Sequence, residues 1–589
     1  MGTISDKLMR IINTKEDIRQ ALISKGYDVP TSILFKEYAK MISDLPCKVD
    51  DFPKLPGDVT RWYFGGLTNE MMAAMDDPRI EDADHKGRFL SIKNFAWSGM
   101  SGVGGYVQNF NNFRNNATVD KVRIDEQSSN SVKVTILATG INNAIYIPKN
   151  IYQFNKSYFI KISSEGYNEG DLSLLFYAPS TSTATTVKVP LNPNGITEIP
   201  AIKEDDFLAV YLNVGGKVGS ITIEQLPLYP GALVFDGVDD YGTCNNFPIL
   251  TKEKGYTVVA LRQWISMGEG ISGLVSNVKN WFNDGAFVLE YNSNNATNKF
   301  VNRPVSFGNA NIEMDLPNNF TYQTSKSYKG VPITTGSFKG TNSLFVGKLN
   351  NIIGNCSNVA IWELVFLDHD ATEEELTKIK DYFVKAYPWL FFDQAWTVTG
   401  KTNEDEDRAT IANITGNGND LVCLNLGFIE GSGYNEEGEY AGYLVTDGVD
   451  DKITSSDFKM GKDFTIVGDW KFIDNKKSGT GLVKGSSFYI YNTMIGLDLY
   501  INSGSVKNSL DGIKSINAAC SDGRAYDRNW NEILANTGNV VGSSGALEVS
   551  SSGGRFDRIA FKNLAIYPRI LSKDDCIKAY NYLQTLKSK

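Results

Sequence analysis

Four short sequence blocks recur in the same order in two parts of the 589-residue chain. The first block is a Trp followed six residues later by Thr-Asn-Glu, at Trp62 and again at Trp396. The third block is L-V-F-D-G-V-D-D at 233–240 and L-V-T-D-G-V-D-D at 444–451. An ordered repeat of this kind indicates one structural unit present twice. The other matches are Gly87, Leu90, Asn94, Phe95 and Trp97 with Gly418, Leu421, Asn425, Leu426 and Phe428, and 358–362 with 563–567.

The spacing of the blocks indicates an insertion in the first copy. The third and fourth blocks are 123 residues apart in the first copy and 117 in the second. The second and third blocks are 150 residues apart in the first copy but 30 in the second. The extra segment, 112–229, is as long as a domain and consists of short apolar runs separated by turn residues. We therefore predict a β-sandwich inserted at a surface turn of the first copy.

Most of the remaining chain is also strand-like, and Gly occurs 54 times, as many tight turns require. Two long helical patterns stand out, at 371–387 and 572–589. Each follows a matching strand, NVAIWELVFL in the first copy and NLAIYPRIL in the second. We expect each repeat to end in a strand and a helix.

The first 46 residues predict a small helical module. Thr14 is a plausible N-cap with Asp17 three residues on, Gly26 ends the first helix, and Pro30 precedes the second. Two such helices bury too little surface to be stable alone, so we expect the module to pack on sister chains or on another protein. Residues 47–58, with two prolines, predict a linker.

Composition excludes several classes of function. The net charge is −10, with no basic block, which argues against binding nucleic acid or anionic lipid through the overall field. No apolar run reaches the length of a membrane span, and the first twenty residues lack the pattern of a secretory signal.

The cysteine and histidine inventory disfavours metal and triad chemistry. The closest of the six cysteines are 56 residues apart, so no C-x-x-C motif exists, and we expect buried free thiols as in a reducing cytoplasm. Only two histidines occur, His85 and His369, both beside aspartates in polar turns. We expect both to be exposed and neither to be catalytic.

The repeated unit resembles the laminin-G-like, concanavalin-A-like jelly-roll family. The matching features are the opening Trp strand, G-N-G-N-D-L at 416–421, F-D-G-V-D-D-Y at 235–241 and the A-I-W or A-I-Y strand before an acidic helix. The resemblance implies two packed antiparallel sheets per copy. It also implies glycan or protein binding, since members mostly bind such ligands and some hydrolyse glycans.

The N-terminal module resembles a short helical element of tailed-phage structural proteins. The pattern is T-K-E-x-I-x-x-A-L-x-x-K-G, then V-P, then a Tyr-containing helix, within 14–42. G-M-S-G-V-G-G-Y at 99–106 is similar to sequence in phage proteins of gut Bacteroidetes. The two resemblances together imply a virion appendage.

Several residue groups are candidates for chemistry, and each has a simpler structural explanation. Hydrolases on this jelly roll often carry E-x-D-x-x-E or E-x-D-x-E, but 313–317 here lacks the third carboxylate. The acids at 404–407 predict a solvated turn, and the glycine-rich 99–106 lacks the G-K-[ST] of a phosphate loop. Any single aromatic is more readily explained by packing than by sugar stacking.

The two D-G-V-D-D turns have two possible explanations. They could hold calcium, or they could be tight turns closed by Asp side chains, and Phe235 favours the tight turn in the first copy. The aspartates concerned are Asp236, Asp239, Asp240, Asp447, Asp450 and Asp451.

We predict a mainly β chain with no catalytic, cofactor-binding or metal residues assigned. Its units are a helical module at 1–46, a linker at 47–58, a jelly roll at 59–390 interrupted by the sandwich at 112–229, and a second jelly roll at 393–589. The expected function is that of a non-enzymatic structural virion protein, a head or tail fibre adhering to host or mucosal glycans. It would lie on the virion surface as a homo-oligomer, with a trimer favoured by the resemblance, attached to other virion proteins through the module. The alternatives are a phage polysaccharide depolymerase on the same fold and, less favoured, a bacterial glycan-binding protein.

Overall fold

The computed structural model describes residues 51–588 with internal gaps. The gaps are 182–183, 251–253, 267–270, 279–285, 294–298, 305–311, 314–318, 333–340, 351–354, 417, 439, 474–479, 485–487, 493–495, 502–507, 512–515, 535–542 and 553–554. The predicted helical module at 1–46 and Cys47 lie outside the described residues. The described chain is mainly β, which confirms the predicted fold class.

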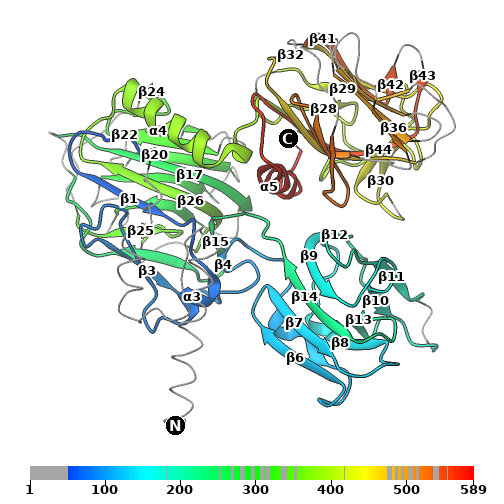
Figure 1. The fold of residues 1–589 in the computed structure, drawn as a ribbon. Coiled ribbons are helices and arrows are strands. Elements are labelled where there is room, and N and C mark those ends of the chain that lie inside the picture. The colour runs from blue at the N-terminus through cyan, green and yellow to red at the C-terminus, as the bar shows by residue number, and fades with distance from the viewer. Residues whose placement is uncertain are drawn as a thin grey trace, which may run out of the picture.

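The first jelly roll consists of two eight-stranded antiparallel sheets (Figure 1). One sheet runs β24 (Val331–Pro332), β23 (Ser327–Tyr328), β22 (Phe320–Thr324), β17 (Thr257–Ser266), β26 (Asn358–Leu367), β15 (Leu233–Asp236) and β4 (Gly102–Val103), with β1 (Val59–Tyr63) paired to β26. The other runs β2 (Arg79–Glu81), β3 (Phe89–Lys93), β16 (Tyr241–Cys244), β25 (Leu344–Val346), β18 (Ser272–Ser276), β19 (Phe287–Ser293), β20 (Lys299–Pro304) and β21 (Ile312–Glu313). Between the sheets lies an apolar core that includes Trp62, Phe235 and Phe366.

The inserted segment forms its own sandwich between β4 and β15, as predicted. One five-stranded sheet runs β11 (Val187–Pro190), β10 (Ser173–Tyr177), β13 (Ala209–Asn213), β8 (Asn143–Pro148) and β5 (Arg114–Asn115). The other runs β12 (Ile196–Ile199), β9 (Tyr158–Glu165), β14 (Gly219–Gln225), β7 (Ser131–Ile136) and β6 (Val122–Gln127). Alternate residues of these strands point inward and build a separate core.

The second jelly roll repeats the topology of the first. One sheet runs β30 (Gly433–Asn435), β31 (Tyr443–Val445), β44 (Ile559–Tyr567), β33 (Thr465–Phe472), β38 (Ile516–Cys520), β39 (Arg524–Asp527) and β40 (Glu532–Leu534), with β27 (Gln394–Thr397) paired to β44. The other runs β28 (Thr410–Ile411), β29 (Leu421–Leu424), β32 (Lys452–Met460), β41 (Ser543–Val549), β34 (Thr480–Lys484), β35 (Phe488–Asn492), β36 (Gly496–Ile501) and β37 (Asn508–Asp511), and β42 (Ser551–Ser552) pairs with β43 (Arg555–Phe556). The closing strands β26 and β44 occupy equivalent central positions.

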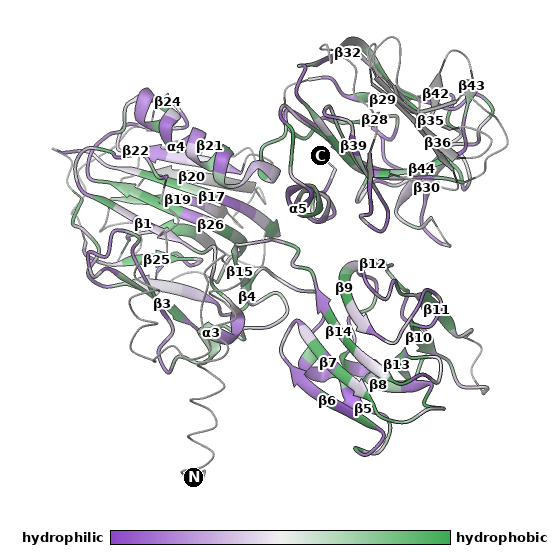
Figure 2. Ribbon diagram, in the orientation of Figure 1, coloured by the Kyte–Doolittle hydropathy of each residue, from purple (hydrophilic) through white to green (hydrophobic). Residues whose placement is uncertain are grey.

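The described helices are few and short. They are α3 (Asn69–Ala73), α4 (Glu373–Ala386) and α5 (Lys573–Leu583), with the 3-10 turns η1 (Phe110–Asn112), η2 (Lys149–Ile151) and η3 (Pro388–Leu390). Helix α4 begins at a capping box in which Thr372 and Glu375 bond each other's backbone N–H, and most of its residues are hydrophilic (Figure 2). Helices α4 and α5 confirm the two predicted closing helices. Within the described residues, no helix is long and apolar enough to cross a membrane.

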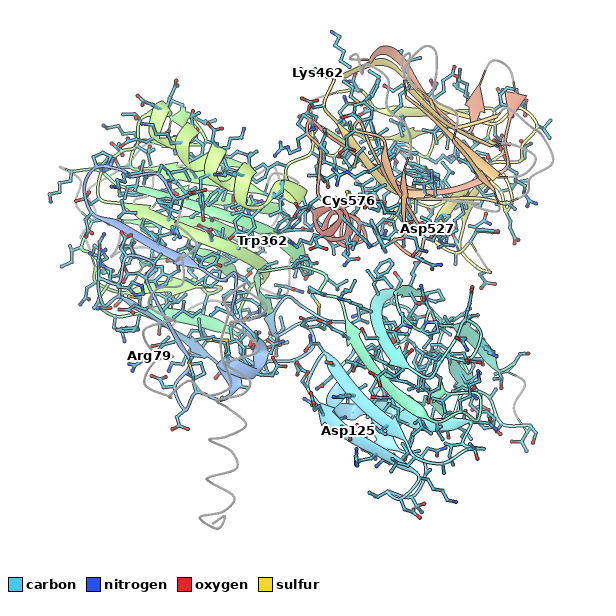
Figure 3. All side chains as sticks on the ribbon, in the orientation of Figure 1. Arg79, Asp125, Trp362, Lys462, Asp527 and Cys576 are labelled. Carbon is cyan, nitrogen blue, oxygen red and sulfur yellow. The ribbon has the colours of Figure 1, made fainter. Side chains whose placement is uncertain are left out.

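Helix α5 joins the three sandwiches (Figure 1). One apolar cluster combines Trp362 of the first jelly roll, Phe159 and Ile196 of the insert, and Tyr580 and Tyr582 of α5. Figure 3 shows Cys576 on α5 close to Trp362, at the centre of the molecule. Because this cluster crosses all three sandwiches, we infer that their mutual arrangement is fixed by packing rather than by the linkers.

Hydrogen bonds reinforce this junction. The Tyr582 hydroxyl donates to Asn319 Oδ1 at 2.6 Å, and the Tyr567 hydroxyl donates to the Trp389 carbonyl at 3.0 Å. Arg528 Nη2 lies 3.0 Å from Glu198 Oε2 on strand β12 of the insert. Every described cysteine is a buried free thiol, as predicted. These are Cys244, Cys356, Cys423, Cys520 and Cys576.

Candidate functional site

The first D-G-V-D-D segment is a tight turn closed by its own aspartates. Asp236 Oδ1 accepts the Val238 N–H at 2.7 Å, and Asp240 Oδ2 accepts the Asp236 N–H at 3.1 Å. Gly237 adopts φ +81, and a Cβ there would lie 2.9 Å from Asn358. The hydrogen bonds of Asp236 and Asp240 support the tight-turn explanation, and the adjoining Phe235 packs inward in the core as expected.

The second segment repeats this geometry. Asp447 Oδ1 accepts the Val449 N–H and Asp451 Oδ2 accepts the Asp447 N–H, both at 2.7 Å. Gly448 adopts φ +74. Thr446, in the place of Phe235, is buried and bonds Asp557 and Ile559 through its hydroxyl. The repeated motif thus encodes a repeated corner of the fold.

Other corresponding residues of the two copies form matching hydrogen bonds near this corner. Ser101 donates to Asp240 at 3.0 Å, as Ser432 donates to Asp451 at 2.8 Å. Upstream, the Asn69 side chain pairs with the backbone of Val103, and its counterpart Asn403 pairs with Tyr434. The first and third repeated blocks thus contribute the same hydrogen bonds in each jelly roll.

Each corner also brings three carboxyl groups close together. In each, three carboxylates offer oxygen atoms within 4.8 Å of one another, a spacing that a hard cation could share. Burial raises the pKa of Asp240 to about 7, with a contribution from the charges of Asp236 and Asp239. Burial likewise raises the pKa of Asp451, whose Oδ1 accepts no hydrogen bond from the described residues.

Asp240 is expected to make stability fall with rising pH. Because its folded-state pKa of about 7 exceeds its ordinary value of 3.8, the folded chain binds more protons between these values. Its contribution to the free energy of unfolding is therefore full below about pH 4 and lost as the pH rises through 7. Between pH 5 and pH 8, the melting temperature of Asp240→Asn in thermal unfolding should fall by less than that of the parent. Identical pH profiles of parent and variant would contradict the assignment, and a calcium-dependent gain at pH 8 in the parent alone would indicate a bound cation.

The remaining candidates occupy structural positions. His85 is exposed as expected, beside Glu81, but His369 is not: its side chain is 25% exposed, and Nε2 lies 3.1 Å from Glu375 at the start of α4. The predicted exposure of His369 was wrong because the capping carboxylate draws the ring onto the helix end. The acids at 404–407 form a surface turn in which Asp405 caps Thr402. The side chains of 313–317 lie outside the described residues.

A groove at the junction of the insert and the second jelly roll is the strongest candidate site. Its two parts have volumes of about 490 and 510 Å³ and share the lining residues Asn194, Asn529 and Asn531. Helix α5 supplies Lys573, and other groove-lining residues are Lys161, Ser163, Asp574, Lys578 and Asn581 in the first part and Asn168, Glu169 and Asn192 in the second. Trp530, Ile196, Ile577, Leu226, Pro227 and Pro230 provide an apolar floor.

Asp527 organises the loop that reaches into the groove. Its Oδ1 accepts the backbone N–H groups of Asn529 and Asn531 at 2.8 Å each, and Oδ2 accepts the Asn531 side-chain amide at 2.9 Å. Trp530 between them adopts φ +61, an uncommon conformation for a bulky residue. Its ring packs edge-on against Tyr580 of α5, whereas Asn529 and Asn531 on either side of it are exposed.

The lining suits a ligand with many hydroxyl groups. Side-chain amides both donate and accept hydrogen bonds, and an apolar floor with a few convergent polar groups is typical of small-molecule sites. Asn581, buried in the wall, has an Oδ1 that accepts no hydrogen bond from the described residues. Among the lining residues, the groove carries two carboxylates, Asp574 in the first part and Glu169 in the second.

Sequence reasoning missed this groove. Its residues come from segments more than 300 positions apart, and only the docking of α5 brings them together. The one available signal was the pair of asparagine-rich turns, L-N-P-N-G at 191–195 and D-R-N-W-N at 527–531.

Comparisons with known proteins add little to the site. No family model matches the chain, and no curated protein matches it. Among solved structures, Trypanosoma rangeli sialidase with the inhibitor DANA aligns over 84% of this chain and 92% of its own, at 10% identity and a TM-score of 0.23. The botulinum neurotoxin serotype D binding domain aligns over 55% of this chain and 84% of its own, at 10% identity and a TM-score of 0.22. Similarities of this size carry no argument about activity.

Proposed function

We propose that the chain is a structural virion protein of a tailed bacteriophage, a head or tail fibre that adheres to host or mucosal glycans. Adhesion is supported by one observation above all, the amide-lined groove with an apolar floor between the insert and the second jelly roll. The virion assignment rests on the resemblance of 14–42 to phage structural proteins. In this proposal the N-terminal module attaches the chain to other virion proteins and assembles it, as a trimer, on the particle surface.

The rigid junction supports an adhesive role. A fibre transmits force between particle and host, and the shared cluster around α5 ties the sandwiches together without depending on flexible linkers. The chain's acidic balance fits a partner other than nucleic acid.

The groove is expected to bind glycans through Asn529 and Lys573. Both side chains are exposed, so Asn529→Ala/Lys573→Ala should fold normally. A neutral hydrogen bond contributes about 0.5–1.5 kcal/mol and a charged one about 1.5–3. The double variant should therefore bind at least tenfold more weakly in calorimetric titration of the full chain with mucin glycans and purified capsular polysaccharide.

A matched control and a second readout separate the alternatives. Asn150→Ala/Lys156→Ala changes the same residue types at exposed positions of the insert outside the groove, and it should bind like the parent. Release of reducing ends during the titration would favour the depolymerase alternative. Equal affinities of parent and groove variant would remove the groove from the proposal.

A further inference from the structure

The inserted sandwich has one sheet turned toward the junction and one turned away from it. Phe159 on β9 packs edge-on against Tyr580 of α5 at 5.3 Å, and Glu198 on β12 pairs with Arg528. These strands belong to the sheet β12-β9-β14-β7-β6. The opposite sheet, β11-β10-β13-β8-β5, lies on the side of the insert away from α5 (Figure 1).

Three tyrosines gather on the outer surface of this second sheet. Tyr211 on β13 lies directly opposite Tyr146 on β8, with ring centroids 5.6 Å apart. Tyr177 on β10 reaches Tyr211 diagonally, at 6.0 Å and nearly perpendicular. Burial raises the pKa of Tyr211, and the neighbouring Tyr146 and Tyr177 add to the shift. We call Tyr146, Tyr177 and Tyr211 the tyrosine face.

The face remains open to solvent although its strands are packed on the other side. Tyr177 is 40% exposed, and Tyr146 and Tyr211 are partly exposed. Their strand neighbours Phe176 and Leu212 point the other way, into the core of the insert. A cross-strand tyrosine pair alone would stabilise a sheet, but here a third ring, nearly perpendicular to that of Tyr211, extends the aromatic surface beyond what pairing requires.

Exposed cations stand at both ends of the row that contains Tyr146 and Tyr211. The strand register places Arg114 of edge strand β5 opposite Tyr146. On the other side, Leu175 is opposite Tyr211, and Lys188 of edge strand β11 is opposite Leu175. With neighbouring strands about 4.8 Å apart, the backbones of Arg114 and Lys188 are about 19 Å apart across the sheet. In a chain with a net charge of −10, this row is a local site of opposite sign.

We propose that the tyrosine face binds an anionic polysaccharide that lies across the strands. Sugar rings would pack their C–H faces on the tyrosines, whose hydroxyl groups remain available for hydrogen bonds. Carboxylate or sulfate groups, repeated along the polymer, would pair with Arg114 and Lys188 at the same time. The site is separate from the groove, and its biological meaning rests on the proposed adhesion function, which it deepens by naming the class of ligand.

The test is affinity electrophoresis of the full chain in gels containing polygalacturonate, heparin or neutral dextran. Polygalacturonate carries carboxylates and heparin carries sulfates, so the two gels distinguish the anionic group. We expect the parent to be retarded by at least one of them and not by dextran. Tyr177→Ala/Tyr211→Ala should weaken retardation at least tenfold, and Tyr177→Phe/Tyr211→Phe, which keeps the rings, should retain most of it.

Charge variants keep the test valid if the alanine variant folds poorly. Arg114→Glu/Lys188→Glu alters only exposed side chains and should also weaken retardation at least tenfold. Lys121→Glu, an exposed cation before β6 on the other sheet, should behave like the parent.

Each contrary result has a distinct meaning. If neither acidic polymer retards the parent, the proposal that the tyrosine face binds polysaccharide is wrong. The groove, and with it the proposed function, would still be tested by the calorimetric titration. If the charge variant loses binding but Tyr177→Ala/Tyr211→Ala binds like the parent, the retardation is due to unspecific charge attraction, which would overturn the proposal. A smaller solution mass of the alanine variant would assign the face to contact between copies of the chain and overturn it as well.

Discussion

Replacing Glu290 with Gln is expected to destabilise the first jelly roll by about 3–5 kcal/mol. Glu290 is fully buried on β19 and receives two bonds of 2.7 Å from the equally buried Arg262 on β17. Thr321, Tyr328 and Trp264 donate further hydrogen bonds to the same carboxylate. Burial alone would raise the pKa of Glu290, but the Arg262 guanidinium holds it below its usual range. Removing the charge would leave the guanidinium buried without its counter-ion.

The prediction is checked by urea unfolding followed through amide protection in β17 and β26. Arg262→Met/Glu290→Leu removes both charges and should recover part of the loss, because an apolar pair avoids the desolvation cost of the ions, although Thr321, Tyr328 and Trp264 lose their acceptor. Glu224→Gln, an exposed change in the insert, should stay within about 0.5 kcal/mol of the parent. A Glu290→Gln variant as stable as Glu224→Gln would show that the buried pair contributes nothing.

Replacing Trp362 with Ala should weaken the junction between the two jelly rolls. Trp362 has no exposed surface, its indole N–H donates to the Pro230 carbonyl at 2.9 Å, and its ring meets Tyr582 of α5 edge-on at 6.1 Å. Buried Trp-to-Ala changes cost about 3–5 kcal/mol. Because the lost contacts reach α5, we expect calorimetry to show the two jelly rolls unfolding in separate transitions.

The second copy offers a comparison within the same apolar cluster. Tyr567 on β44 lies in this cluster, and its hydroxyl donates to the Trp389 carbonyl. Tyr567→Phe removes only that hydroxyl and should cost about 1–3 kcal/mol, the penalty of leaving a buried carbonyl unpaired. A Trp362→Ala variant that unfolds in one transition at the parent's temperature would contradict the role given to the junction.

The repeat carried most of what could be predicted about the fold. Because blocks at 62–70, 87–97 and 233–240 match the second copy in order, the repeat and the insertion between the second and third blocks followed from spacing. The fourth match, 358–362 with 563–567, was wrong by five residues: Leu233 pairs with Ile361, and its counterpart Leu444 pairs with Phe561. Helical patterns at 371–387 and 572–589 predicted the two closing helices, which the structure places at 373–386 and 573–583. The exact domain boundaries stay predictions.

The features that depend on three-dimensional register could not be predicted. Tyr146, Tyr177 and Tyr211 lie on three strands, and only the pairing of β8, β13 and β10 places them together. Arg262 occupies the place of Trp470 in the second copy, after the same strand bulge, and nothing in its sequence neighbourhood indicates a buried ion pair with Glu290. The groove likewise exists only because α5 docks on the insert.

The central claim is that this chain is displayed on a virus particle. The direct measurement is immunogold electron microscopy of particles purified from the producing culture, with antibodies raised against residues 59–589. The proposal predicts gold at a fixed position on the particle surface, on head or tail, and loss of that label when particles carry a chain without residues 1–46. Particles that carry no label, while the chain is abundant elsewhere in the culture, would contradict the virion assignment.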